Sequence, residues 1–199
     1  MDRANTSPQE RRAERTRARI HVAALELFVS KGYDATTVAE IADAADISER
    51  TLFRYFRAKE DIIFDRPERF IGAAQDLIAG LDSNVSDWQA VRLALREFAG
   101  IMEAEQETVR QSSGLMLTVP ELGARGTLME HHWSEGLARG LARRRGEAQP
   151  SLDDLALASA GMALFGAAAR RWVHDGRLTM PEITDETFRR FRERISTTS

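Results

Sequence analysis

The stretch TTVAEIADAADISERTLFRYFRAKED, residues 36–61, contains the signals for two short helices joined by a turn. Thr37 precedes apolar residues at helical spacing, and Glu40 follows it by three positions. This is the pattern of a capping box, in which each side chain accepts a hydrogen bond from the other residue's amide. Ser48 is a natural N-cap for the second helix. The stretch therefore predicts a helix-turn-helix.

The second of these helices separates into an apolar and a polar face. Leu52 and Phe56 are four residues apart, so both are expected to face inward. The outward positions are Arg50, Thr51, Arg54 and Tyr55. From Arg50 to Lys59 there are three arginines, one lysine and no acidic residue. A short helix with this outer face suits the major groove of double-stranded DNA, flanked by phosphates.

The composition indicates an all-α protein with room for a packed core. The chain has 199 residues, of which 43% are hydrophobic, and Ala, Leu, Arg and Glu are abundant. The absence of cysteine excludes disulfides, thiolate metal sites and cysteine nucleophiles. The first residues lack the apolar core of a signal peptide, and the longest uncharged run, residues 155–169, is too short to span a bilayer. We therefore expect a cytoplasmic protein without a membrane partner.

The formal net charge of −3 hides an uneven distribution along the chain. Residues 1–60 carry 11 basic and 10 acidic side chains, whereas residues 61–199 carry 17 basic and 21 acidic ones. Five arginines between Arg11 and Arg19 concentrate the positive charge further. An acidic body with a small basic surface directs DNA to that surface. The alternative is that this run is only the solvated start of a helix.

Apolar periodicity predicts helices along the rest of the chain. The expected ranges are 11–31, the helix-turn-helix, a fourth helix from residue 59 that Pro67 lies within or interrupts, 87–104, 105–118, a helix ending at 145, 151–175 and 181–195. In the helix that ends at 145, the inward residues are expected to be Leu128, Trp133, Leu137 and Leu141. We divide the chain into an N-terminal domain, residues 11–70, and a C-terminal domain, residues 71–199.

The helix expected at 151–175 is apolar nearly all round, so it must be covered on more than one side. Small residues and one arginine recur on it at helical spacing: Ser159, Ala163, Gly166, Ala167 and Arg170. Only one more helix follows to cover it, which favours contact with a second copy in a homodimer. The alternative is the central core helix of a monomer.

The stretch AALELFVSKGYDATTVAEIADAADISERTLFRYFRAKEDII, residues 23–63, resembles the N-terminal domain of the TetR family of transcriptional regulators. The resemblance extends over residues 12–70, and residues 71–199 match only in layout. Within the family, residues 49–64 look similar to a branch that includes mycofactocin-type regulators. The resemblance implies a two-fold dimer that binds a palindromic operator and is released when a small hydrophobic or amphipathic effector enters the C-terminal domain, as in a repressor.

The resemblance also implies roles for individual residues. Thr37 and Lys59 resemble phosphate contacts, whereas Phe53 and Tyr55 fall where the family has an aromatic pair against the DNA backbone. The base-facing or groove-facing positions are Ser48, Glu49, Arg50, Thr51 and Arg54. Three residues depart from the family pattern: Asp46 replaces a turn glycine, Phe53 replaces a tyrosine, and Ala58 replaces a serine cap. None of these departures breaks the motif.

Apolar and sulfur side chains of the C-terminal domain form a candidate effector pocket, because methionine-rich surfaces adapt to hydrophobic ligands. Its expected members are Phe98, Met102, Leu115, Met116, Met129, Trp133, Met162 and Phe165. The alternative is that they are plain core. We expect no cofactor and no metal, since only His131 and Glu135 have ligand-like spacing. A helical hydrolase is the rival from another class, and no nucleophile motif supports it; a DNA-binding adaptor with a protein-binding C-terminal domain is the second alternative.

Overall fold

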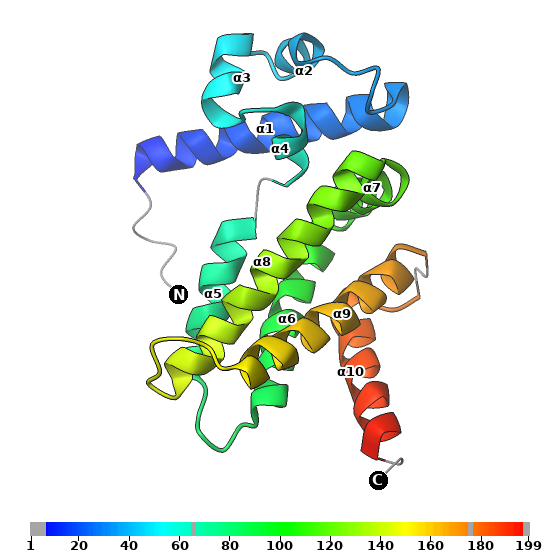
Figure 1. Cartoon of the computed structure of the whole chain (residues 1–199). Coiled ribbons are helices and arrows are strands. Elements are labelled where there is room, and N and C mark those ends of the chain that lie inside the picture. The colour runs from blue at the N-terminus through cyan, green and yellow to red at the C-terminus, as the bar shows by residue number, and fades with distance from the viewer. Residues whose placement is uncertain (1–6, 65–66, 175–176, 197–199) are drawn as a thin grey trace.

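The computed structural model describes residues 7–64, 67–174 and 177–196. Every element in those ranges is a helix, which confirms the all-α prediction. The helices are α1 (Pro8–Lys31), α2 (Val38–Ala44), α3 (Glu49–Tyr55), α4 (Lys59–Ile63), α5 (Pro67–Gly80), α6 (Asp87–Ala104), α7 (Gln106–Thr118), α8 (Pro120–Arg144), α9 (Leu152–His174) and α10 (Met180–Ser196). Helices α1–α4 lie together at one end of the molecule, and α5–α10 form the remainder (Figure 1).

In the N-terminal domain, α1–α4, helix α1 is long and the other three are short, and local signals start and stop α2 and α3. The capping box of α2 is present: the Thr37 hydroxyl accepts from the Glu40 amide at 3.3 Å, and Glu40 accepts from the Thr37 amide at 2.9 Å. Ser48 caps α3 by accepting from the Thr51 amide at 3.2 Å. In the turn between them, Asp46 has φ +52°, a left-handed conformation that costs a residue other than glycine some energy.

The core of the N-terminal domain is apolar and extends beyond α1–α4. Leu52 and Phe56 are buried, as the helical spacing predicted. The other large buried side chains are Ile20, Leu25, Phe28, Ile41, Ile62 and Ile63. Leu122, at the start of α8, is also fully buried in this cluster. The C-terminal domain thus contributes directly to the core of the N-terminal one.

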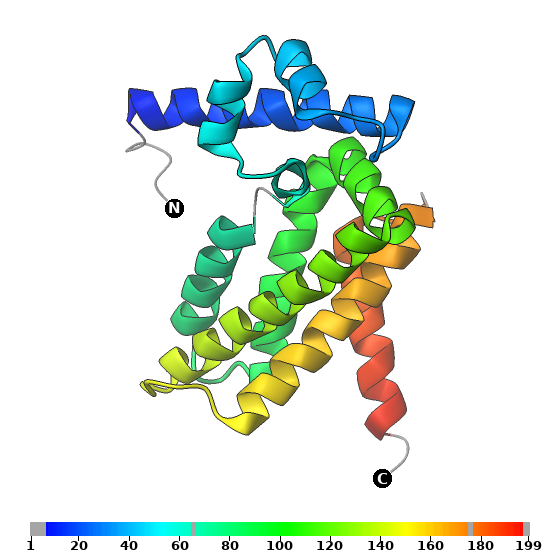
Figure 2. The ribbon, with the colours of Figure 1, turned by 45° about the horizontal axis from the view of Figure 1, so that its top comes forward.

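The C-terminal domain, α5–α10, packs around α8, with α5 on one side and α9 on the other (Figure 2). Two glycines let α5 and α8 come very close. A Cβ atom on Gly136 would lie 2.4 Å from Ile71 Cγ2, and one on Gly140 would lie 3.2 Å from the Gln75 Cα. Gly161 of α9 packs as closely on α6, where a Cβ would lie 2.5 Å from Val91 Cγ1.

Most predicted helices agree with the structure, but three details of the prediction differ from it or were left open. Pro67 starts a separate helix, α5, because proline fits the first turn, where its missing N–H costs nothing. Phe70, which we assigned to the N-terminal domain, is buried in the C-terminal core. Leu128 does not face inward: it is 71% exposed, whereas Trp133, Leu137 and Leu141 on the same helix are buried.

Helix α9 is the one helix within the described ranges that is long and apolar enough to cross a membrane. It packs against α6, α8 and α10. Only 33% of its most apolar window is buried in this single chain. Six of the exposed positions form an outer stripe on α9: Leu152, Ala156, Ser159, Ala163, Ala167 and Arg170. If another surface packs on this stripe, that surface belongs to another molecule.

Candidate DNA-binding surface and effector site

The outer face of α3 lies at the end of the molecule opposite the C-terminal domain (Figure 1). Arg50 and Arg54 are four residues apart and both exposed, so they share one face of the helix. Glu49 is also exposed, and Phe53 is 50% exposed. Thr51 is half-buried, and its hydroxyl lies 2.9 Å from that of Ser48. The predicted base-facing residues are therefore brought together on one surface.

Tyr55 differs from the other outward positions because it is half-buried against the domain core. The Arg17 guanidinium lies 5.6 Å from its ring centroid and 5.4 Å from that of Phe56. The Arg54 guanidinium lies 5.3 Å from the Tyr55 centroid. These are cation–π distances. Sequence reasoning noted the basic run in α1 but had no signal that Arg17 would stack beside α3.

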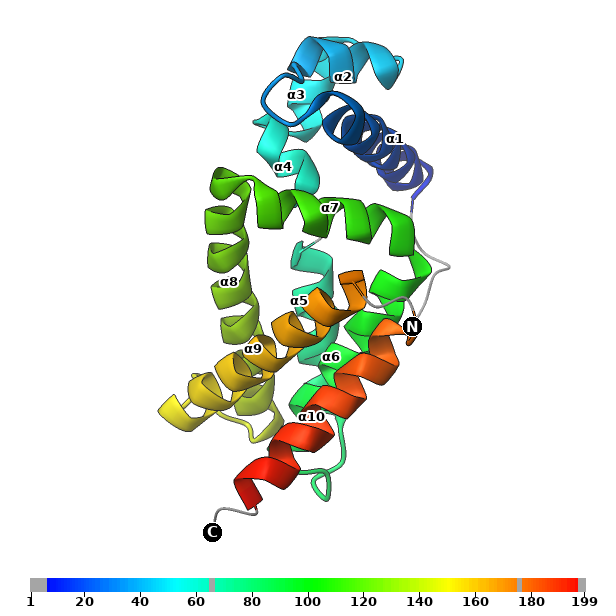
Figure 3. The ribbon, with the colours of Figure 1, turned by 90° about the vertical axis from the view of Figure 1, so that its right-hand side faces the viewer.

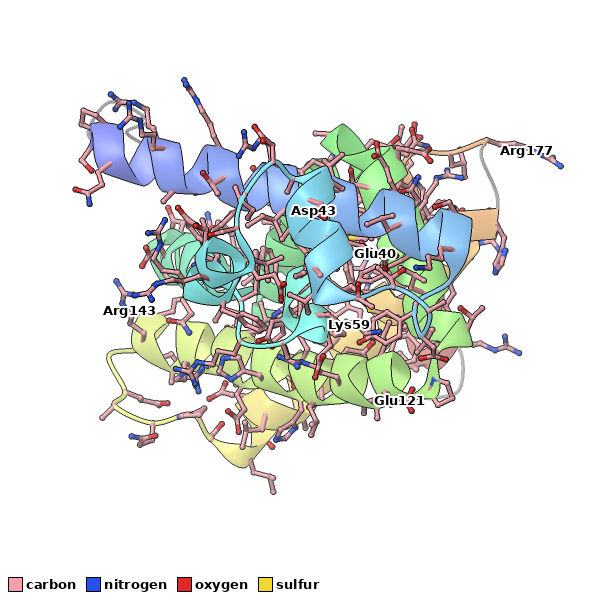
Figure 4. All side chains as sticks on the ribbon, turned by 90° about the horizontal axis from the view of Figure 1, so that it is seen from above. Glu40, Asp43, Lys59, Glu121, Arg143 and Arg177 are labelled. Carbon is pink, nitrogen blue, oxygen red and sulfur yellow. The ribbon has the colours of Figure 1, made fainter. Side chains whose placement is uncertain are left out.

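Lys59 has a structural role that the sequence motif did not indicate. Its ammonium donates to the carbonyl of Tyr33 at 2.7 Å and to that of Thr36 at 3.1 Å, and it lies 4.2 Å from the Tyr33 ring centroid. Lys59 and Glu40 are both labelled in Figure 4, which looks down on the N-terminal domain. An ammonium has three donors, so one N–H at most remains for a phosphate. Lys59 ties the start of α4 to the α1–α2 loop.

Burial of Tyr33 raises the pKa of its phenol to about 12, and the carboxylates of Glu60, Glu121 and Asp34 add to the effect. The phenol beside Lys59 is therefore neutral at any pH at which DNA is bound. Ala58 provides no side-chain cap for α4, as the sequence predicted. Asp61 supplies only the reciprocal half of a capping box, by accepting from the amides of Arg57 and Ala58, each at 3.0 Å.

An aromatic cluster occupies the C-terminal core at the predicted effector site. Its members are Phe70 of α5, Phe98 of α6, Trp133 of α8 and Phe165 of α9. The Trp133 ring meets that of Phe98 edge-on, with centroids 4.8 Å apart, and that of Phe70 at 5.2 Å. Phe98 lies 5.5 Å from Phe165. Met102, Met129 and Met162 pack into the same core.

Leu115 and Met116 do not belong to this cluster, although both were predicted in the pocket. They pack against the core of the N-terminal domain. The reason is the path of α7, which crosses beneath the N-terminal domain and packs on α1 (Figure 3). Its second half therefore points its apolar side chains away from Phe98 and Trp133. This crossing also gives α7 contact with both domains.

A second connection between the domains is polar. Arg125 of α8 forms an ion pair with Asp61 of α4, and its guanidinium lies 5.4 Å from the ring centroid of Phe64. Glu60 is more distant, 4.0 Å from the same arginine. Asp61 is thus shared between the cap of α4 and a bridge to α8. Asp61 and Arg125 are 64 positions apart, and no sequence pattern indicates such a pair.

The histidines of α8 do not gather a metal site. His131 Nε2 lies 3.5 Å from Glu135 Oε1, and the His131 side chain is 74% exposed. Throughout the described ranges, no group of three or more His, Asp or Glu side chains could hold a metal ion.

This arrangement of a capped helix-turn-helix on a larger helical domain defines a DNA-binding regulator, and two sequence families match it in order along the chain. Residues 20–65 match the family of bacterial regulatory proteins named tetR, and residues 85–196 match the MftR C-terminal domain. The chain belongs to the TetR family of transcriptional regulators.

One relative supports this family assignment, and two solved structures share the fold. A Mycobacterium tuberculosis (strain H37Rv) protein, named as the mycofactocin biosynthesis transcriptional regulator MftR, is 30% identical over 91% of this chain and 93% of its own. A TetR-family regulator structure from Syntrophomonas wolfei has a TM-score of 0.66 at 19% identity, covering 92% of this chain and 96% of that one. The Bacillus subtilis FadR structure, solved with stearoyl-CoA, has a TM-score of 0.60 at 19% identity, covering 86% and 95%. The similarity to the mycofactocin-type branch is confirmed.

Proposed function

We propose that this regulator is a homodimeric repressor that binds a palindromic operator and is released by a small hydrophobic or amphipathic effector. The observation that carries the proposal is the exposed face of α3, where Arg50 and Arg54 stand side by side at the end of the molecule. Arginine is suited to guanine in the major groove, because its two N–H groups can donate to O6 and N7 of that base. The other residues of α3 that were predicted to face DNA support this contact between arginine and guanine.

Phosphate contacts surround this face. Thr37 is exposed at the start of α2, and Arg11, Arg12 and Arg15 are exposed along the first turns of α1. Contacts to phosphate position a protein on DNA without reading its sequence. Lys59 contributes mainly by holding the α1–α2 loop in place, through its bonds to the carbonyls of Tyr33 and Thr36.

Dimerisation supplies the second half-site. The outer stripe of α9, defined above, consists mostly of small residues, so a second helix can approach it closely. Phe191 and Ile195 of α10 are 37% and 52% exposed and extend the apolar surface. Gly166 is less suited to this role than the sequence indicated, because its Cβ position lies 3.7 Å from Glu130 of α8. Ala163 is the better probe of the interface.

The effector binds in the aromatic cluster, and DNA release follows from a change in the spacing of the two α3 helices. A ligand shifts such an equilibrium only by its difference in affinity for the two states. FadR of Bacillus subtilis, which holds stearoyl-CoA, is an example of a long apolar ligand in this fold. We place the protein in the cytoplasm, where its DNA is.

The decisive experiment is a mobility-shift assay with DNA from upstream of the gene. Arg54→Ala should cost about 1–3 kcal/mol on the operator and relax base preference at one position. Arg143→Ala is the matched control, because Arg143 is an exposed arginine on α8 at the edge of the molecule in Figure 4. Equal losses on operator and random DNA for Arg54→Ala and Arg50→Ala would refute base reading.

Effector gating needs a separate measurement. Trp133→Ala or Phe165→Ala should abolish release by the effector and leave operator binding nearly intact. If both variants still release DNA at the effector concentration that the unaltered protein needs, the aromatic cluster is not the effector site. A C-terminal domain that binds a protein and no small molecule would identify the chain as a DNA-binding adaptor.

A further inference from the structure

The indole N–H of Trp133 is the feature of the C-terminal core that the fold does not use. Trp133 is only 8% exposed, and its Nε1 atom is buried without a hydrogen-bond partner among the described residues. Most buried polar groups in proteins are paired, and each exception calls for an explanation. A phenylalanine would fill much of the same space without burying a donor. Trp172 shows the ordinary solution, since its Nε1 donates to Glu103 at 2.9 Å.

The side chains known to contact the Trp133 ring are the aromatic rings of Phe70 and Phe98. Phe70, Phe98, Met129 and Leu137 belong to the same core as Trp133, and they come from three helices, α5, α6 and α8. None of these side chains offers an oxygen acceptor. A hydrogen bond from a buried N–H to an acceptor on a ligand is strong, because water competes little in such a site.

We infer that Trp133 donates a hydrogen bond to a neutral oxygen acceptor, such as the carbonyl of a ketone, ester or thioester, on an otherwise apolar effector. This inference rests on the effector site proposed above and specifies its chemistry. The aromatic cluster holds the apolar body of the ligand, and the single donor fixes its orientation. Trp133 is therefore a specificity-determining residue of that site.

The acceptor is neutral because Phe70 and Phe98, the rings in contact with Trp133, carry no charge to pair with an anion. The buried charged groups of this domain are already paired elsewhere: Asp154 with Arg145, and Arg144 with Asp87. A carboxylate beside Trp133 would gain one hydrogen bond but lose its hydration, and the free energy of this transfer is unfavourable in an apolar site. A carbonyl loses far less on the same transfer.

A pair of probes that differ only in the acceptor tests the inference. Benzophenone carries a carbonyl where diphenylmethane carries a methylene group, and both are aromatic, as the cluster is. We expect the full-length protein to bind benzophenone about tenfold more tightly than diphenylmethane, the value of one good hydrogen bond in a buried site. Diphenylacetate, which is charged, should bind more weakly than either.

Trp133→Phe should remove this difference and leave diphenylmethane binding unchanged within about twofold, since only the donor is lost. Trp88→Phe is the matched control, because Trp88 lies on α6 in contact with Phe188 and Phe191. That variant should keep the preference for benzophenone. In nitrogen-labelled protein, the indole signal of Trp133 should move downfield with benzophenone and not with diphenylmethane. This spectroscopic result does not depend on how well any variant folds.

Equal binding of the two neutral probes, binding of neither, or an unmoved Trp133 signal would overturn the inference. An unmoved signal would mean that the N–H donates to no acceptor of the bound probe. The binding and NMR measurements need no DNA, so they test this inference separately from the proposed function. A protein that binds benzophenone through Trp133 and never releases its operator would refute effector gating alone.

Discussion

In the N-terminal domain, side-chain caps mark the starts of the short helices α2 and α3, whereas in the C-terminal domain long helices meet through glycines and distant ion pairs. Thr37 and Ser48 each act within three residues of their own position. Gly136 and Gly161, in contrast, are explained only by Ile71 and Val91, which lie on other helices. The first domain is thus specified locally and the second by contacts between distant segments.

This difference matches what each domain does. A surface that binds DNA must keep α3 in a fixed orientation, and caps and a tight turn fix it. A domain that admits an effector must change its packing, and its helices are held by interactions that a ligand can alter. Variants that act on one kind of interaction should therefore leave the other domain intact.

The largest expected effect comes from the interface between two copies of the C-terminal domain. Ala163→Glu should place a charge in the outer stripe of α9 and give monomers, because a buried unpaired charge is very costly. Operator affinity should fall by about a hundredfold or more, since the second half-site no longer binds in the same complex. Sedimentation and mobility-shift assays on the same samples measure both effects.

Gly100→Glu is the control for this change, because Gly100 is exposed on α6 and its Cβ position has open space. It adds the same charge and should leave the dimer and the operator affinity unaltered. An unaltered protein that sediments as a monomer at micromolar concentration would contradict the dimer.

The next effect tests the close helix packing inside the same domain. Gly136→Ala should destabilise the protein by about 1–3 kcal/mol, because its Cβ would collide with Ile71 near that residue's backbone. Gly100→Ala should have the opposite sign and add up to about 1 kcal/mol through helix propensity. Urea unfolding followed by circular dichroism compares them. Equal effects of the two substitutions would show that the close approach of α5 and α8 is not a constraint.

Local specification explains how much of the fold could be predicted from the sequence. The caps at Thr37 and Ser48, the left-handed Asp46 and the bounds of α6 all depend on residues close in the chain, and the structure confirms them. Leu128 shows the limit of periodicity, which identifies an apolar stripe without saying whether a neighbour covers every turn of it.

The candidate sites divide in the same way. The exposed face of α3 follows from the spacing of Leu52 and Phe56. Two contacts join segments that are far apart in the sequence: the hydrogen bonds of Lys59 and the ion pair of Arg125 with Asp61. No sequence motif could predict them. The prediction that Met116 belongs to the effector site was wrong for a similar reason. The direction of α7 depends on packing between the domains, which no local pattern indicates.

A smaller effect is expected at the bridge between the two domains. Arg125→Ala removes the ion pair with Asp61 and should change the effector concentration needed for DNA release by about 2- to 30-fold, in line with coupling changes of 0.5–2 kcal/mol. Effector affinity measured without DNA should change little. Arg139→Ala, on the same helix and paired with Glu135, is the control. A release curve that does not move would leave α7 as the route between the domains.

The smallest effect concerns the capping box of α2. The hydrogen bonds from Lys31 and Thr37 lower the pKa of Glu40 from 4.5 to about 2. The folded-state pKa is below the unfolded one, so this carboxylate stabilises the protein at pH values above about 4.5 and ceases to do so as the pH falls through about 2. The side chains of Glu40 and Lys31 are exposed, so salt should weaken the interaction.

We therefore expect Glu40→Gln to lower stability slightly at pH 6, with the difference from the unaltered protein shrinking toward pH 2. Glu26→Gln, an exposed carboxylate on α1, is the matched control. The buried Asp154 of the C-terminal domain should respond less to salt. Burial alone raises the pKa of Asp154, but hydrogen bonds from Arg145 and Ser151 outweigh it and hold that pKa below its usual value. A Glu40 carboxyl that titrates at its ordinary pKa in NMR spectra would show that the capping box does not hold in solution.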